Sequence, residues 1–360
     1  MKKLLLAAAV AAMGVSAAQA APTLYGKLNV SIDQVDNYDF LGNNVSEVSS
    51  HASRIGVKGE EKLTDNLSAV YQAEWGFATD GSGSDSEWSA RNRFVGLKWA
   101  GIGTLKAGQY DSYFKTAAGS AQDIFNDHTR LDITNMMHGE ERTKNAIGIE
   151  TDKKLLGGVQ LNIMALQGEN STAPTAGTSG DNSKRNGFGD GISASVLYDN
   201  KDLGLSLGLA ANSAVEGKYV GFDNKKYISD ALRFTAAYDF SKVGINGLSL
   251  GGLWQTAQPT DDLSTAKNLQ EDAYTIAAAY KIGSTPWVVK AEYANANTQY
   301  DNAGLSYDHD INQYGLGVDY YFNKQARMYG IVASQERDWK TKAGEDDTMT
   351  VFGLGMEYNF

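Results

Sequence analysis

The chain ends in the stretch VFGLGMEYNF (residues 351–360), and this stretch decides between two kinds of fold. Large apolar side chains stand at every second position of it: Phe352, Leu354, Met356, Tyr358 and Phe360. Side chains of an extended strand point alternately to its two faces, so all five lie on one face. Both a strand of a soluble sandwich and a strand that turns its apolar face to lipid would show this pattern. The rest of the chain has to distinguish them.

The same alternation recurs along the chain. At 67–77, apolar and aromatic residues alternate with polar ones such as Gln72 and Glu74, and at 203–209 leucines alternate with glycine and serine. Regular alternation indicates strands and not helices. We expect sixteen strands, near 23–33, 51–62, 67–78, 90–99, 103–110, 142–151, 158–168, 189–199, 203–212, 229–240, 247–257, 271–282, 286–297, 309–321, 325–336 and 348–360.

Connections and faces favour a membrane barrel over a sandwich. Tight links such as 99–103 and 322–324 alternate with long polar stretches such as 35–50, 169–187 and 298–308. Outer-membrane barrels have short periplasmic turns and long outer loops. The face opposite the apolar one carries charged residues and glutamine, which could not form the dry core of a sandwich. The sequence therefore predicts an all-β fold, a 16-stranded antiparallel transmembrane β-barrel with a lumen too wide for side chains to fill.

The N-terminus indicates export. Lys2 and Lys3 precede a short apolar run and the small-residue site AQA at 18–20, the pattern of a cleaved secretory signal peptide. We expect residues 1–20 to be removed and residues 21–360 to form the barrel. A net charge of −11 argues against a nucleic acid as partner, and the absence of cysteine excludes disulfides.

Several stretches resemble the general diffusion porins of Gram-negative outer membranes, above all the branch of beta- and gammaproteobacteria. They are LYGKLNVSID (24–33), SRIGVKGEEKLTDNLSAVYQAEWGF (53–77), RNRFVGLKWAGIGTLKAGQYDS (91–112) and the terminal phenylalanine. The resemblance covers the mature chain in order. It implies an outer-membrane homotrimer, in contact with lipid and lipopolysaccharide, that passes small hydrophilic solutes and ions by passive diffusion. It also implies that the barrel-assembly machinery recognises the last strand, where Tyr358 and Phe360 would form the signal.

The resemblance further implies a constriction, in which an inward-folded third loop faces basic residues of the barrel wall. The longest insertion, 111–142, would be this loop. The wall residues would be Lys27, Arg54, Arg91, Arg93 and Arg142. Strand alternation also points these side chains to the lumen, and a lipid-facing Arg or Lys at mid-depth would cost roughly 2–4 kcal/mol.

The acidic side of this constriction is less well defined by the sequence. We expect Asp123 and Asp127 to face the basic wall, although the loop reads AQDIFND at 121–127 where enteric porins carry a different motif. Asp132, Glu140 and Glu141 are alternatives. Together with the net charge, these acids predict a modest cation preference at low salt, where distant charges are screened least.

No pattern of an enzyme is present. The four histidines, His51, His128, His138 and His309, lack a metal-binding spacing such as HExxH, so we expect no metal and no cofactor. Two alternatives remain open: a porin selective for sugars or organic anions, and an outer-membrane hydrolase with a Ser–His–acid site that uses His128 or His138.

Overall fold

A computed structural model describes residues 21–38, 40, 42–81, 88–126, 128–169, 185–339 and 348–360. Strands dominate this part of the chain. In order, they are β1 (Thr23–Asp36), β2 (Val45–Ser50), β3 (Arg54–Lys62), β4 (Leu67–Gly76), β5 (Ser89–Trp99), β6 (Gly103–Asp111), β7 (Arg142–Thr151), β8 (Val159–Gln167), β9 (Phe188–Asn200), β10 (Leu205–Lys218), β11 (Lys226–Asp239), β12 (Leu248–Pro259), β13 (Lys267–Lys281), β14 (Trp287–Asn302), β15 (Leu305–Tyr321), β16 (Ala326–Trp339) and β17 (Thr348–Asn359).

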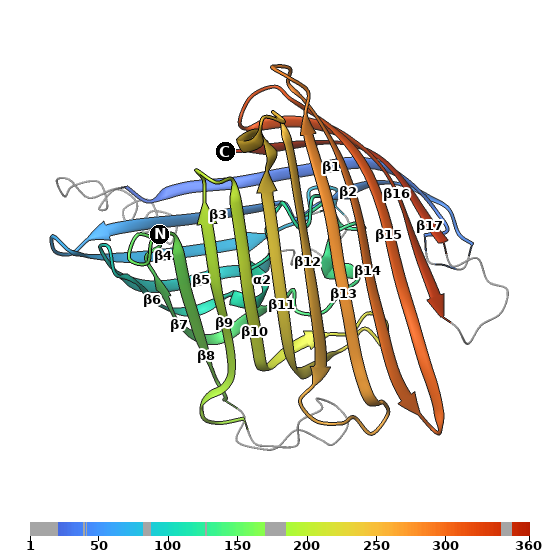
Figure 1. The fold of residues 1–360 in the computed structure, drawn as a ribbon, viewed down its shortest axis with the longest axis horizontal. Coiled ribbons are helices and arrows are strands. Elements are labelled where there is room, and N and C mark those ends of the chain that lie inside the picture. Colours follow the sequence, from blue (N-terminus) through green and yellow to red (C-terminus); the bar gives the residue numbers. More distant parts are fainter. Residues whose placement is uncertain are drawn as a thin grey trace, which may run out of the picture.

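The strands form one closed antiparallel barrel (Figure 1). Apart from β2 and β3, each strand pairs with its neighbour in the chain, and β17 pairs with β1, where the backbone N–H of Phe360 donates to the carbonyl of Gly26 (3.1 Å). Segments β2 and β3 both pair with β1 and act as one strand that is interrupted at Ala52, whose φ is 48°. The barrel is therefore sixteen-stranded, which confirms the predicted fold class.

The two faces of the barrel differ in the way that the alternation predicts. Leu354 on β17 is 72% exposed and Val95 on β5 is 62% exposed, although both are apolar. The opposite face holds buried polar side chains such as Ser31 and Gln255. A surface with apolar side chains outside and polar ones inside suits a barrel whose outer face meets lipid.

Several strands extend further than the sequence indicated. The stretch at 298–308, expected as a long loop, is mostly strand, because β14 runs to Asn302 and β15 starts at Leu305. Ala303 and Gly304 form the tight turn between them and have the positive φ values that such a turn needs. The expected signal peptide at 1–20 lies outside the described residues. The helices of the described residues are α2 (Tyr113–Thr116) and the 3-10 helices η1 (Ile133–Asn135) and η2 (Phe240–Val243). None of them is long and apolar enough to cross a membrane.

The longest connection joins β6 to β7 and comprises residues 112–141, which we call the β6–β7 segment. It carries α2 and η1, and Figure 1 draws α2 within the outline of the barrel. Its apolar side chains are buried, among them Phe114 and Leu131. Glycines on the wall allow its close approach. A Cβ at Gly251 would lie 1.8 Å from the carbonyl oxygen of Ala121, and one at Gly315 would lie 2.4 Å from the ring of Phe125.

Candidate pore lining

The β6–β7 segment is hydrogen-bonded to inward-facing side chains of β9 to β15. Ser193 on β9 accepts from the backbone N–H of Phe114 (3.1 Å), and Glu292 on β14 accepts from that of Ile124 (2.7 Å). Gln313 on β15 donates to a carbonyl further along the segment, that of Leu131 (2.7 Å). These contacts fasten the segment to one side of the inner wall.

Arg233 on β11 is the most extensively bonded of these wall residues, and it is fully buried. Its guanidinium forms an ion pair with Glu140 of the segment (2.7 Å) and donates to the carbonyl of Phe114 (3.2 Å). It also donates to Gln255 on β12 (2.9 Å). A charged group pays a desolvation penalty on burial, so a fully buried arginine requires such a complete set of partners. Alternation along β11 is consistent with an inward Arg233, but no sequence pattern singles it out, because Phe114 and Glu140 lie far away in the chain.

A row of alternating charges crosses the inner wall from β14 to β1. Arg327 on β16 lies at its centre and pairs with Asp319 on β15 (2.8 Å) and Glu357 on β17 (2.9 Å). Asp319 also pairs with Lys290 on β14 (3.1 Å), and Glu357 with Lys27 on β1 (3.6 Å). Three cations thus share two carboxylates, and the row keeps an excess of positive charge.

A second charged group lies on β3 to β7. Glu74 on β4 accepts from Arg91 on β5 (2.6 Å) and lies 4.0 Å from Arg54 on β3. Asp111 at the end of β6 pairs with Arg142 on β7 (3.2 Å) and with Lys115 of the β6–β7 segment (3.5 Å). Cations again outnumber carboxylates. The structure therefore brings Lys27, Arg54, Arg91 and Arg142 onto the inner wall, where their direct partners are mainly wall carboxylates.

Arg93 does not lie on the inner wall, so its predicted orientation is wrong. It shares the outer face of β5 with Val95, and its guanidinium donates to Gln109 on β6 (2.8 Å). Phe94 points inward instead, with its ring 5.7 Å from that of Tyr110. The pairing of β4 with β5 shifts register just before Arg93, and such a bulge changes the face on which the following residues lie.

Asp123, one of the two predicted loop acids, contributes less charge than expected. Asp123 is 2% exposed and accepts from the side chain of Asn126 (3.1 Å). Burial and the neighbouring carboxylates of Asp132, Glu292 and Glu140 raise the pKa of Asp123 well above its usual range. Asp127 lies outside the described residues. Of the alternatives, Asp132 caps η1, Glu140 pairs with Arg233, and Glu141 pairs with Lys226 (2.6 Å).

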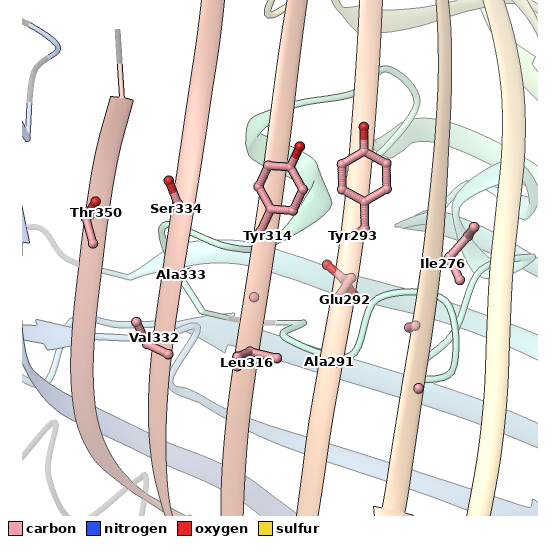
Figure 2. A pocket seen from close by; sticks show the side chains of 13 residues that line it. Ile276, Ala291, Glu292, Tyr293, Tyr314, Leu316, Val332, Ala333, Ser334 and Thr350 are labelled. Carbon is pink, nitrogen blue, oxygen red and sulfur yellow. The ribbon is translucent and has the colours of Figure 1, made fainter. Parts of the chain in front are cut away.

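A cavity of about 370 Å³ is lined by both the β6–β7 segment and the row of alternating charges. Asp123 and Ser120 belong to the segment, and Lys27, Lys290 and Arg327 belong to the row. A larger groove of about 550 Å³ lies on the barrel's other face (Figure 2). Its lining includes the exposed apolar side chains Ile276, Tyr314 and Leu316, so it belongs to the outer surface and not to the lumen.

In the part of the chain that the structure describes, the surroundings of His128, His138 and His51 differ from a Ser–His–acid site. Within the described residues, His128 and His138 have no serine hydroxyl among their hydrogen-bond partners, and burial with the nearby Arg233 lowers the pKa of His138 to about 3. His51 has both Ser31 (2.6 Å) and Asp33 (3.6 Å) on its Nε2 atom. A catalytic triad needs the serine and the acid on opposite ring nitrogens.

Comparisons with known proteins agree with this architecture. A family profile described as Gram-negative porin matches residues 5–341. The major outer membrane protein P.IB of Neisseria sicca is 25% identical over the full length of both chains, and so is outer membrane porin N of Escherichia coli K12. Among solved structures, the anion-selective porin from Comamonas acidovorans is 20% identical, with a TM-score of 0.68 over 94% of this chain and 99% of that one.

Proposed function

The chain belongs to the family of Gram-negative porins, and we propose that the β6–β7 segment narrows its lumen to a weakly ion-selective passage. The protein is a passive diffusion channel of the outer membrane. The observation that carries the proposal is the attachment of the segment to the wall beside a charged cavity. The segment is hydrogen-bonded to β9–β15, and Arg327 on β16 and Lys27 on β1 line the same cavity from the rest of the wall. Solutes therefore pass between a hydrogen-bonded backbone and a charged wall.

The sign of the selectivity follows from the charges that line the passage. Cations exceed carboxylates both in the row around Arg327 and in the group around Glu74 and Asp111. Asp123, which was expected to balance them, is buried and its raised pKa favours the neutral form. Charges in a confined passage are screened less than charges in the wide vestibules. We therefore propose a weak anion preference in place of the cation preference that net charge predicts.

Reversal potentials in planar bilayers under a KCl gradient test this proposal. We expect a small reversal potential with the sign that preferential passage of chloride produces. This potential should persist in concentrated salt, because the wall charges are confined. Liposome swelling with sugars of increasing size measures the width of the passage in the same preparation. A clear cation preference at high salt would show that the loop acids dominate and that the charges assigned to the wall do not set selectivity.

We also propose that the functional unit is a homotrimer in which another copy covers the outer face around β5 and β6. Arg93 supports this location, because a lipid-facing arginine at mid-depth costs roughly 2–4 kcal/mol and Gln109 is its only polar neighbour on that face for which a hydrogen bond is described. Arg93→Glu should lower the yield of trimers on non-denaturing gels. Gln299→Glu on β14 is an exposed control that should leave the yield unchanged.

The remaining proposals concern export and assembly. We propose that residues 1–20 are a removed signal peptide and that the barrel-assembly machinery recognises Tyr358 and Phe360 on the exposed face of β17. Lipid and lipopolysaccharide would then cover the apolar outer face. Phe360→Asp should reach the periplasm and yet insert poorly, as measured by its amount in purified outer membranes. Wild-type amounts there would contradict the role of Phe360.

A further inference from the structure

A cavity of about 250 Å³ lies at the end of the barrel that carries the longer connections, apart from the two charged wall groups. Tyr38 and Phe40, in the connection between β1 and β2, line it, and so does Arg337 near the end of β16. Lys218 at the end of β10 and Arg130 in the β6–β7 segment complete its charged lining. Long connections lie on the external side of an outer-membrane barrel. A solute from outside therefore meets this cavity, which we call the mouth cavity, near its point of entry.

Cations exceed carboxylates around the mouth cavity. Arg130 is already neutralised, because two of its nitrogens donate to Glu47 on β2 (2.6 and 3.2 Å). Among the described residues, Lys218 and Arg337 have no carboxylate at ion-pair distance, although both side chains are half-buried. A cation that leaves water without a counter-charge is unfavourable. Two positive charges therefore remain for an anionic ligand.

Aromatic rings and a buried amide hold the two guanidinium groups in place. Cζ of Arg130 lies 4.1 Å from the centre of the Tyr38 ring, and Cζ of Arg337 lies 4.2 Å from that of the Phe40 ring. Nε of Arg337 donates to the side chain of Gln335 (3.1 Å), which is 2% exposed. The terminal nitrogens of Arg337 have no hydrogen-bond acceptor in the part of the chain that the structure describes. The outer edge of this guanidinium is therefore oriented and available to a ligand.

The lining of the mouth cavity suits a small organic anion with two carboxylates. A planar guanidinium binds a carboxylate through two parallel hydrogen bonds, and a lysine contributes a compact positive charge. The volume of about 250 Å³ is sufficient for such a molecule, since a water molecule occupies about 30 Å³ of the liquid. Val220 and Met349 also line the cavity and would contact the carbon chain of the ligand. Inorganic phosphate has no carbon chain and would lack these contacts.

We propose that the mouth cavity is a binding site for small dicarboxylates that enter from the external side. The site rests on the proposed function, a passage for hydrophilic solutes, but not on the ion preference of that passage. Arg327 of the charge row lies near the start of β16 and Arg337 near its end, so the two sites lie at different depths of the lumen. A cleft with charges of one sign raises the local concentration of its counter-ions. Binding must remain weak, because a solute that is held too tightly does not leave a channel.

Saturation-transfer NMR of the folded protein in detergent micelles tests the proposal, with succinate as the probe. We expect a saturable signal from succinate, and a weaker affinity for propionate, which has a single carboxylate. Inorganic phosphate should displace succinate only at a concentration about tenfold higher or more. Lys218→Gln and Arg337→Gln should each weaken succinate binding by about tenfold, the effect of one lost charge-assisted hydrogen bond. Lys225→Gln is the matched control, since Lys225 is also a cation of this end of the barrel but pairs with Asp223 (3.0 Å) and does not line the cavity.

Folding of each variant is checked by its heat-dependent mobility on gels. Should Arg337→Gln fail to fold, Lys218→Gln decides alone, because the ammonium group of Lys218 has no hydrogen bond to lose within the described residues. Binding in micelles involves no ion flow, so its result is independent of the reversal potential that tests the passage. A wild-type protein with no saturable succinate signal would overturn the proposal. So would an affinity that Lys218→Gln leaves unchanged, an equal affinity for phosphate, or a loss of binding in Lys225→Gln.

Discussion

Replacement of Arg233 by methionine should release the β6–β7 segment from the barrel wall. The change keeps a long apolar side chain but removes the ion pair with Glu140 and the hydrogen bonds to Phe114 and Gln255. Glu140, whose side chain is 7% exposed, would remain buried without its partner. Loss of one member of a buried ion pair typically costs about 3–5 kcal/mol. Since 1.4 kcal/mol corresponds to a factor of ten, the segment should detach roughly 10² to 4 × 10³ times more often.

Single-channel recordings in planar bilayers measure this release, because a detached segment should widen the passage. We expect Arg233→Met to show a higher mean conductance, frequent transitions between levels and faster cleavage within 112–141 by added protease. A matched control is Lys226→Met. It breaks an ion pair with Glu141 of the same segment, but Lys226 is 51% exposed, so the cost should be only about 0–1 kcal/mol.

A second variant separates loss of attachment from loss of folding. Arg233→Met combined with Glu140→Gln removes the unpaired charge, so the double variant should recover part of the wild-type protease resistance. An Arg233→Met channel with wild-type conductance, noise and protease resistance would refute the reasoning. It would mean that the other contacts of the segment suffice to hold it.

Three further predictions concern the wall, the buried acid and the closing strand. Replacing Arg54 and Arg91 together by glutamine should shift the KCl reversal potential in the direction of cation preference, because the carboxylate of Glu74 loses its two cationic partners. Asp123→Asn should change the reversal potential little at neutral pH. The pKa of Asp123 is raised in the folded state, so its contribution to the free energy of unfolding declines as the pH rises from the ordinary carboxyl range to the folded pKa. The melting temperature of Asp123→Asn should therefore fall less over this pH range than that of the wild type. Gly26→Val should reduce the free energy of unfolding by about 1–3 kcal/mol, since a Cβ there would lie 2.4 Å from the ring of Phe360. A lower melting temperature would report this loss.

The strand faces could be predicted from the sequence because they depend only on local alternation. Leu28 and Leu354 are exposed and Ser31 is buried, as their positions in the alternation require. Alternation predicted the wrong face for Arg93. A register shift between β4 and β5 turns Arg93 outward, and Phe94 points inward and packs against Tyr110. A bulge has no clear signature in a single sequence, and an aromatic side chain suits either face.

The candidate site could be predicted only in part, because its contacts join distant segments. Inward basic residues such as Arg54 follow from alternation alone. The attachment of Phe114 to Arg233 bridges 119 positions, and the contact of His51 with Thr129 bridges 78. Nor does the sequence reveal that Asp123 is buried, since acidic loop residues are usually exposed.

The pairing of the last residue with the first strand has a consequence for biosynthesis. Because Phe360 and Gly26 exchange backbone hydrogen bonds, the contact that completes the barrel joins opposite ends of the chain. Contacts of such high sequence separation form late and slowly. A product that lacks β17 would keep two unpaired strand edges, on β1 and β16, which are templates for aggregation. Closure of the barrel therefore requires that the last strand has been synthesised. Chains that end before it should remain open, and proteases should remove them.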